Sequence, residues 1–531
     1  MILPRLLGLA VYSAAYCNAV LSTVTLDYGT FKGHANTTSG IISFRGIRYA
    51  DPPLGSLRWQ PPAFPPSKKL GNVDATKFRF ACIGTSQKAS GATTSEDCLF
   101  GNVYIPIQTT LTSELPVLVF FHGGGFESGR TSKYPPDYLM QASTKPFIFA
   151  TFEYRLGQFG FLGGPAVRNN GALNAGLLDQ KAALQWVQRY IGKFGGDPKR
   201  VTIWGQSAGA GSVIYHLTSD GSVGNDSDLF HQAMGDSPSL LSLLDYDNVL
   251  VKNLFITFAG FAGCGSKSTD SATMSCLRAA STNKLATAGS KTLQKMTSSL
   301  YPLGPITDGI YIQKRPVDAL LSDSFVQVPM LFGSNTNEGA DWSATLANPE
   351  ANTSFPHANE GTVFNFLAGQ YTTFSNASFQ TAVSNYYLLS DYGGNVSLQG
   401  QQMYGEMRYI CTALLATGAA VDAGLPAYQY HWDNPTLGSG HGDELVAFFN
   451  STQGLDAADV SLVTAMRQYW TSFVTSGIPV AAGAPAWTAG NDTDGSPRLL
   501  LHPGNVKLEN VSNALSQRCA FWRGLAPELM T

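Results

Sequence analysis

The sequence predicts an α/β fold in which a large, mostly parallel central sheet is flanked by helices. Short apolar runs rich in β-branched and aromatic residues recur along the chain, at 115–121, 147–152, 201–204 and 328–332. Their length and unbroken hydrophobicity are typical of strands that are buried on both faces. Because helical patterns lie between these runs, we expect parallel strands, with ligand sites beyond their carboxyl ends.

The clearest helix is expected over residues 177–194. Apolar side chains recur there at every fourth position, and two glycines and a proline follow the pattern. The chain contains no internal repeat, and its proline- and glycine-rich pieces are scattered rather than gathered into one linker. We therefore expect residues 20–531 to form a single domain.

Composition excludes several classes of protein. The 531 residues carry a formal net charge of −3, which provides no basic surface for nucleic acid. A hydrophobic fraction of 44 % excludes a disordered chain. Only 13 % of the residues are charged, against about 25 % in an ordinary soluble domain, so hydration of the surface needs a further source.

The N-terminus predicts export from the cell. Residues 1–19 combine Arg5, an apolar run and small residues, as in a secretory signal peptide, and the run is too short to span a membrane. Cleavage after Ala15 and cleavage after Ala19 both fit. The second removes Cys17 and leaves six cysteines, an even number suited to three disulfides outside the cytosol. The C-terminus carries neither a lipid-anchor tail nor a retention signal, so we expect a secreted, extracellular product without stable membrane insertion.

Eight Asn-x-Ser/Thr sequons agree with that compartment, because a signal peptide brings such sites to the glycosylation machinery. They are Asn36, Asn225, Asn352, Asn376, Asn395, Asn450, Asn491 and Asn510. Glycans at these positions would supply the hydration that the few charged side chains do not.

The sharpest local motif is Gly-Gln-Ser-Ala-Gly at residues 205–209, between the apolar run at 201–204 and a helical pattern. A G-x-S-x-G sequence in this setting is typical of a nucleophile elbow, a tight turn that lifts a serine hydroxyl out of the sheet. A Cβ at either glycine would crowd the neighbouring strands, and the helix N-terminus places N–H groups beside the serine. Ser207 is therefore the candidate nucleophile.

A serine nucleophile also needs donors for the oxyanion that forms on its substrate. His122 and three glycines directly follow the predicted strand at 115–121. Such H-G-G-G turns supply half of the oxyanion hole in lipases and esterases, and the N–H after the nucleophile, here that of Ala208, supplies the rest. A glycine run alone is more often a flexible loop, but its place after a buried strand favours the functional interpretation.

The general base must be one of eight histidines. In this architecture the chain order is serine, acid, histidine, with each on a loop after a strand. His441 is favoured because glycines on both sides allow a loop to present it. His431 and His502 are the alternatives by order, although His431 lies in a run that is typical of a strand.

The acid is expected in the loop after the apolar run at 328–332. Glu338 lies in that loop, and Asp308 and Asp341 are the alternatives.

These motifs belong to a longer resemblance. The chain resembles the type-B carboxylesterase/lipase family of cholinesterase-like α/β-hydrolases, and we expect a secreted fungal member. The similarity extends over nearly all of the mature sequence, and its segments follow in the family's order. They are FRGIRYADPP (44–53), SEDCL (95–99), YRLGQFGFL (154–162), NAGLLDQ (174–180), FGGDP (194–198) and CAFW (519–522).

The resemblance implies an α/β-hydrolase fold and ester hydrolysis through an acyl-enzyme, without metal or organic cofactor. Its implied triad is Ser207, Glu338 and His441, and its implied oxyanion donors are Gly124, Gly125 and Ala208. It also implies the disulfides Cys82–Cys98, Cys264–Cys276 and Cys411–Cys519, and the structural ion pairs Arg58–Glu96 and Arg155–Asp179. Ser237 and Glu444 match positions that support the histidine, with two ordinary loop residues as the alternative.

Two departures from the family bear on the substrate. Cholinesterases hold a choline cation against a tryptophan in the loop closed by the first disulfide, through cation–π attraction. Here that loop, residues 83–97, contains no Trp, Tyr or Phe, and the residue before the nucleophile is Gln206 rather than glutamate. Choline esters are therefore not expected as substrates.

The same loop is the lid in true lipases of the family. Its 15 residues here are mostly Ser, Thr, Gly, Lys and Gln, with too little apolar surface to bind a lipid interface. We therefore expect an esterase of soluble or short- and medium-chain esters. A triacylglycerol lipase is the alternative, and a non-catalytic adhesion or binding module is disfavoured because every triad residue is present. Leu300, Tyr301 and Leu303 either line the acyl pocket or belong to the core.

Overall fold

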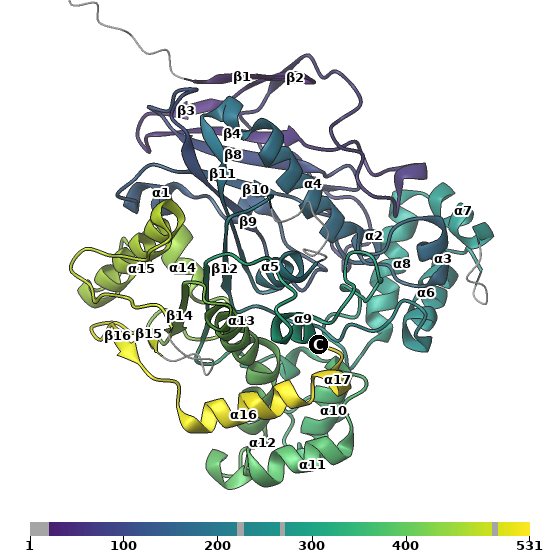
Figure 1. The fold of residues 1–531 in the computed structure, drawn as a ribbon. Coiled ribbons are helices and arrows are strands. Elements are labelled where there is room, and N and C mark those ends of the chain that lie inside the picture. The colour runs from purple at the N-terminus through teal and green to yellow at the C-terminus, as the bar shows by residue number, and fades with distance from the viewer. Residues whose placement is uncertain (1–20, 220–227, 266–270, 491–496) are drawn as a thin grey trace, which may run out of the picture.

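The computed structural model describes residues 21–219, 228–265, 271–490 and 497–531 (Figure 1). The expected signal peptide, Asn225 and Asn491 lie outside these residues. An 11-stranded sheet forms the centre of the fold. In spatial order its strands are β16 (Lys507–Glu509), β15 (Arg498–Leu501), β14 (Ala427–Trp432), β13 (Met330–Asn335), β12 (Gln232–Asp236), β11 (Gly196–Gln206), β9 (Leu115–Phe121), β10 (Ile148–Phe152), β8 (Phe100–Pro106), β4 (Ile41–Arg48) and β3 (His34–Asn36).

In this spatial order, the strands between β15 and β10, including β9, are all parallel. Antiparallel strands flank them, β16 at one edge and β8, β4 and β3 at the other. The predicted strand at 115–121 coincides with β9, and the run at 147–152 starts one residue early. The run at 201–204 is the centre of a longer strand, β11. The run at 328–332 is shifted, because β13 begins at Met330 and continues to Asn335.

Alternate side chains of each strand enter two cores on opposite faces of the sheet, as the pleat of a strand requires. In β9, Val117 and Val119 contribute to one core, and Leu118 and Phe120 to the other. The first core is covered by α4 (Ala175–Tyr190), α5 (Ala208–Thr218), α9 (Pro316–Leu321) and α13 (Cys411–Asp422), and the second by α1 (Asp137–Ala142), α14 (Leu445–Phe449) and α15 (Ala457–Ser476) (Figure 1). The prediction of a largely parallel sheet flanked by helices is confirmed.

The helix expected over 177–194 begins earlier, at Ala175, and its last turn is a 3₁₀ helix, Ile191–Phe194. Gly195 ends it in the left-handed conformation, with φ 80°, where glycine has no steric penalty.

Two helical groups extend the molecule beyond the sheet. The first has its own apolar core and contains α2 (Gly157–Gly160), α3 (Pro165–Asn170), α6 (Val249–Phe261), α7 (Ser271–Ala279) and α8 (Thr282–Lys295). The second contains α10 (Glu360–Gln370), α11 (Asn376–Asn385), α12 (Val396–Gly405), α16 (Asn513–Gly524) and α17 (Ala526–Leu529). Two small sheets complete the fold, β1 (Thr23–Leu26) with β2 (Gly29–Lys32) and β5 (Asn72–Asp74), and β6 (Ala81–Cys82) with β7 (Thr94–Ser95).

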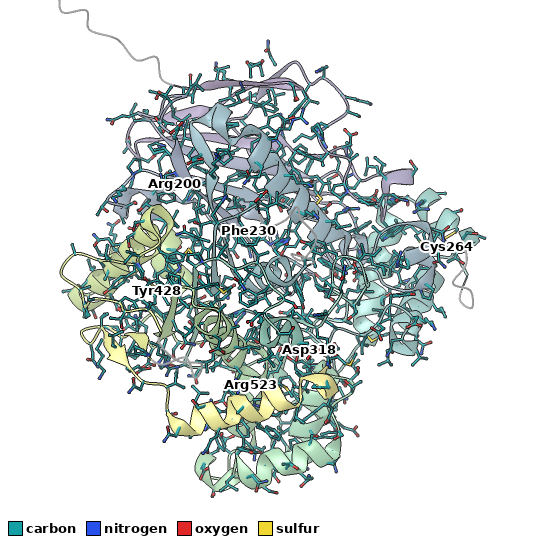
Figure 2. All side chains as sticks on the ribbon, viewed as in Figure 1. Arg200, Phe230, Cys264, Asp318, Tyr428 and Arg523 are labelled. Carbon is teal, nitrogen blue, oxygen red and sulfur yellow. A yellow bond between two sulfur atoms is a disulfide. The ribbon has the colours of Figure 1, made fainter. Side chains whose placement is uncertain are left out.

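Three disulfides join these parts, and they are the pairs that the resemblance implies. Cys82–Cys98 closes the loop at 83–97, Cys264–Cys276 links the end of α6 to α7, and Cys411–Cys519 links α13 to α16. Cys264 lies at the outer edge of its helical group (Figure 2). Both implied ion pairs are also present, since Arg58 Nη2 lies 2.8 Å from Glu96 Oε2 and Arg155 Nη2 lies 2.7 Å from Asp179 Oδ1.

The sequons differ in exposure. Five asparagines are exposed, namely Asn36, Asn376, Asn395, Asn450 and Asn510. Asn352 is only 4 % exposed, and its Nδ2 donates to the main-chain oxygens of Ala344 and Leu346. A glycan is attached through that nitrogen, which is engaged in these two hydrogen bonds in the folded chain, and glycosylation at Asn352 stays a prediction. Within the described ranges, every helix is too short or too polar to traverse a bilayer.

Candidate active site

Ser207 lies in the turn between β11 and α5, in a conformation that serine rarely adopts. Its φ is 58° and its ψ is −123°, outside the regions open to most L-residues. The turn is as tight as the motif predicts, since a Cβ on Gly205 would lie 2.2 Å from the main chain of Gly209. The Ser207 N–H donates to the Asp236 main-chain oxygen at 2.9 Å, which anchors the turn to the end of β12.

The glycine turn after β9 packs directly against this serine. Gly124 and Gly125 have positive φ values of 116° and 64°, and a Cβ on Gly123 would lie 3.0 Å from the Ser207 Cβ. Among the described residues, the N–H groups of Gly124, Gly125 and Ala208 donate to no main-chain oxygen of a turn, loop or helix cap. These N–H groups are therefore available to a ligand oxygen.

His441 and Glu338 meet above the ends of two neighbouring strands. The His441 Nδ1–H donates to Glu338 Oε2 at 2.6 Å. Their loops follow β14 and β13 and are joined by a hydrogen bond from Asn337 N to Ser439 O of 2.8 Å. Because Nδ1 is occupied by the carboxylate, Nε2 is the nitrogen that remains as an acceptor. Gln206, next to Ser207 in the chain, places its amide nitrogen 3.4 Å from Nε2, so Nε2 lies beside the nucleophile turn.

The second carboxylate oxygen of Glu338 is fixed as well. Oε1 accepts from Ser237 Oγ at 2.5 Å and from Asn335 N at 2.6 Å, and Glu338 is 1 % exposed. Ser237 therefore contacts the proposed acid directly, whereas the resemblance implies only a position that supports the histidine. It follows β12 and has a positive φ of 53°.

Glu444 is linked to the loop of His441 through Asn335. It is fully buried, and its Oε2 accepts from Asn335 Nδ2 at 2.5 Å. The same Nδ2 donates to Gly440 O, the main-chain oxygen just before His441, at 2.6 Å. Burial, followed by the charges of Asp236 and Glu338, raises the pKa of the Glu444 carboxyl well above its ordinary value.

Asp236 and Asn335 belong to the site but were not predicted. Asp236 is fully buried and accepts from Trp204 Nε1 at 2.8 Å and Tyr430 Oη at 3.0 Å. Burial raises the pKa of its carboxyl to about 7. Only their position in the sequence could have pointed to them. Asp236 and Asn335 are each the last residue of a parallel strand, and ligand sites form at the ends of such strands.

The alternative bases and acids have other partners. The two ring nitrogens of His431 contact Glu509 and Thr336, and His502 Nδ1 lies 2.9 Å from Pro503 O. Asp308 Oδ1 accepts three main-chain N–H groups of its own loop, and Asp341 is exposed. Of the candidates, the structure brings together His441 and Glu338.

Aromatic side chains line the space around His441. The Tyr409 ring lies 4.2 Å and the Trp342 ring 5.4 Å from the imidazole, measured between ring centroids. Tyr301 packs against the glycine turn, since a Cβ on Gly125 would lie 2.0 Å from its ring. Leu303 is buried, and Leu300 is partly buried and packs against the core of the second helical group. Tyr301 is thus the member of the expected acyl-pocket set that lies at the glycine turn.

A strained serine on an α/β sheet, next to a histidine–carboxylate pair and unused N–H donors, is the arrangement of a serine hydrolase with an α/β-hydrolase fold. The model of the carboxylesterase family matches residues 21–522, and the chain belongs to that family. It is a serine carboxylic ester hydrolase.

The relatives of this chain include esterases and lipases. Juvenile hormone esterase of Tribolium castaneum is 32 % identical over 86 % of this chain and 84 % of its own. Secreted lipase 1 of Botryotinia fuckeliana (strain B05.10) is 29 % identical over 86 % of this chain and 84 % of its own. The crystal structure of Aspergillus niger EstA matches with a TM-score of 0.83 at 29 % identity, over 96 % of this chain and 99 % of that one.

Proposed function

We propose that this chain is a secreted esterase of soluble or short- and medium-chain esters, with Ser207, His441 and Glu338 as its catalytic triad. The observation that carries the proposal is the contact of His441 with Glu338 on one side and with the nucleophile turn on the other. Ser207 Oγ attacks the ester carbonyl while His441 Nε2 takes its proton, and Glu338 holds the ring in the required tautomer and stabilises the imidazolium.

The remaining steps use the same groups. The oxyanion of the tetrahedral intermediate accepts hydrogen bonds from the N–H groups of Gly124, Gly125 and Ala208, each worth roughly 3 kcal/mol if it acts like a single oxyanion donor. His441 passes its proton to the departing alcohol, which leaves an acyl-enzyme. Water, deprotonated by His441, then releases the acid and restores Ser207.

The loop at 83–97 supports an esterase rather than an interfacial lipase. Thr85 N donates to the main-chain oxygen of Glu127 at 2.9 Å, and Ser90 N to Asn283 Oδ1 at 3.2 Å. With the disulfide at its base, these bonds tie the loop to the body of the molecule, whereas interfacial activation requires a lid that opens an apolar face. The loop also offers no aromatic ring to a choline cation.

Export rests on the leader sequence, the three disulfides and the exposed sequons. Disulfides persist in oxidising compartments, and glycans on five exposed asparagines would compensate for the low content of charged residues. A secreted relative in Botryotinia fuckeliana agrees with this location.

The proposal is tested with ethyl esters of increasing acyl length, an emulsified triglyceride and a choline ester. We expect fast turnover of the short soluble esters, and a loss of at least about 10⁴-fold in kcat for Ser207→Ala and His441→Gln. His502→Gln, which replaces a competing histidine, serves as the matched control and keeps its activity. Turnover in Ser207→Ala close to that of the wild type would refute the assigned nucleophile.

The triglyceride decides the alternative substrate class. A marked preference for emulsified long-chain esters over soluble ones would replace the esterase proposal with a lipase. Absence of hydrolysis of every ester by the folded wild type would favour a binding module instead.

A further inference from the structure

A buried arginine without an acidic partner lies beside the proposed active site. Arg408 is 1 % exposed and belongs to a π-helical segment, Glu406–Ile410, between α12 and α13. Its Nε donates to Ser239 Oγ at 3.0 Å. Among the described residues, no carboxylate forms an ion pair with its guanidinium, whereas the buried Arg58 and Arg155 each pair with a carboxylate through two nitrogens.

Aromatic rings surround the Arg408 cation instead. Its guanidinium carbon lies 5.5 Å, 5.6 Å and 5.7 Å from the ring centroids of Tyr301, Tyr404 and Tyr409. Ring faces attract a cation, but they do not replace the oxygen acceptors that the fork of a guanidinium normally binds. The cluster therefore has unused donors and lacks an anion.

The two terminal nitrogens of Arg408, Nη1 and Nη2, have no acceptor among the described residues. They are not among the fully enclosed polar atoms that lack a partner. Both nitrogens therefore keep a trace of accessible surface, although the residue is only 1 % exposed. An arginine keeps its charge under all ordinary conditions, so these unpaired donors stay suited to an anion.

Three contacts connect Arg408 to the reacting groups. Tyr301, under the guanidinium, packs against Gly125 of the oxyanion turn. Tyr409, the next residue, packs on the His441 ring with centroids 4.2 Å apart. Ser239, which accepts from Arg408 Nε, donates its N–H to the Ser207 main-chain oxygen at 3.3 Å. The cation thus lies one side chain away from the oxyanion turn, the base and the nucleophile turn.

We propose that Arg408 binds a carboxylate at the far end of the substrate's acyl chain, so that half-esters of dicarboxylic acids are the preferred substrates. The proposal rests on the esterase function proposed above and specifies its substrate class. The two Nη donors of a guanidinium match the two oxygens of a carboxylate, and a site that leaves such donors unpaired discriminates against a ligand without the acceptor. The Tyr301 and Tyr409 rings then flank the methylene groups of the chain.

The test compares two esters that differ only at the chain end, monoethyl glutarate with a carboxylate and ethyl pentanoate with a methyl group. Acid release is followed by pH-stat titration at constant salt, and the ratio of the two kcat/KM values is the readout. We expect the wild type to prefer the half-ester, and Arg408→Gln to lower the ratio by about 10- to 100-fold while ethyl pentanoate is still hydrolysed. Arg408→Lys should retain part of the preference. Arg498→Gln removes the same charge at β15, where Arg498 pairs with Glu509, and should leave the ratio unchanged.

A second measurement needs only the wild type and decides the matter if Arg408→Gln does not fold. Glutarate should inhibit hydrolysis of ethyl pentanoate competitively and at least tenfold more strongly than pentanoate does, and added salt should weaken that difference. Equal or faster turnover of ethyl pentanoate than of the half-ester, together with no selective inhibition by glutarate, would overturn the role of Arg408 and leave the esterase intact. Hydrolysis of neither ester would instead refute the proposed function.

Discussion

At the scale of single residues, the site is held together by carboxyl groups whose oxygens have separate partners. Glu338 uses one oxygen for His441 and the other for Ser237 and Asn335. Asn335 in turn joins Glu444 to the histidine loop. Each contact removes a rotational freedom of its neighbour, so the imidazole is oriented before substrate arrives.

Glu338→Gln tests that orientation. The amide keeps the shape of the side chain, but its nitrogen cannot accept the Nδ1 proton of His441, and the ring then carries its proton on Nε2, where it cannot act as the base. We expect kcat for a soluble ethyl ester to fall about 10⁴-fold with little change in KM. Asp341→Asn, at the exposed alternative acid, is the matched control and should behave like the wild type. A loss below tenfold in Glu338→Gln would exclude Glu338 as the triad acid.

Two buried carboxyls make folding stability depend on pH. Burial raises the pKa of Glu127 from 4.5 to about 8, and that of Asp236 from 3.8 to about 7. The folded chain therefore binds more protons than the unfolded chain between about pH 4 and pH 8, and its stability falls as the pH rises through this window.

Glu127→Gln should weaken this dependence. The amide oxygen can still accept from Leu303 N, as Glu127 Oε1 does at 2.8 Å, but the side chain no longer releases a proton. We expect the loss of unfolding free energy between pH 5 and pH 8, measured by urea denaturation, to become smaller by roughly 1–3 kcal/mol, at 1.4 kcal/mol per unit of pKa shift. Parallel stability curves for variant and wild type would contradict a raised pKa at Glu127.

At the scale of elements, the proposed nucleophile and the proposed oxyanion turn depend on one close approach between α5 and β9. A Cβ on Gly209, in the first turn of α5, would lie 2.0 Å from the main-chain oxygen of Phe121, the last residue of β9. The glycine turn that carries the proposed oxyanion donors leaves β9 at this point. A shift of α5 away from β9 therefore moves Ser207 relative to Gly124 and Gly125.

Gly209→Ala should damage stability and activity together. We expect a loss of about 2–3 kcal/mol in unfolding free energy, because the added methyl group meets main chain that cannot rotate away. We also expect a lower kcat, since the serine and its oxyanion donors separate. Gly192→Ala is the matched control, because a Cβ there meets nothing within 4 Å, and its effect should stay below about 0.5 kcal/mol. An unchanged melting curve for Gly209→Ala would contradict the tight packing of the elbow.

At the scale of the whole molecule, the sheet was predictable and the helical groups around it were not. Buried parallel strands such as β9 are continuous apolar runs, and the elbow and glycine turn follow two of them, so local patterns locate Ser207 and the oxyanion turn. The partners from other loops are less local. The spacing of residues left several candidates for the acid and the base. Asp236 was missed because β12, with polar residues at both ends, does not form a clear apolar run. Arg408 is functional only through tertiary neighbours, and no motif marks it.

Helix α16, near the C-terminus, holds the segment that carries Arg408 and Tyr409 in place. Cys411–Cys519 joins α16 to α13 just after this segment, and Arg518 Nη2 lies 2.6 Å from Glu406 Oε1 at its start. The disulfide links positions 108 residues apart, against 12 for Cys264–Cys276. A cross-link restricts the unfolded chain more when its loop is longer, so the distant pair should contribute more to stability.

The two disulfides can be compared by replacing each pair with serine. In guanidinium unfolding we expect the Cys411→Ser/Cys519→Ser variant to lose about 2 kcal/mol more than Cys264→Ser/Cys276→Ser, which is the difference in loop entropy at these separations. Its esterase activity should also decline at lower denaturant concentration than its overall fold, because the released α16 no longer braces Tyr409 against His441. Cys264→Ser/Cys276→Ser, in the other helical group, should lose activity and fold in one step. The reverse order of stabilities would show that local packing, rather than the constraint on the unfolded chain, determines what the disulfides contribute.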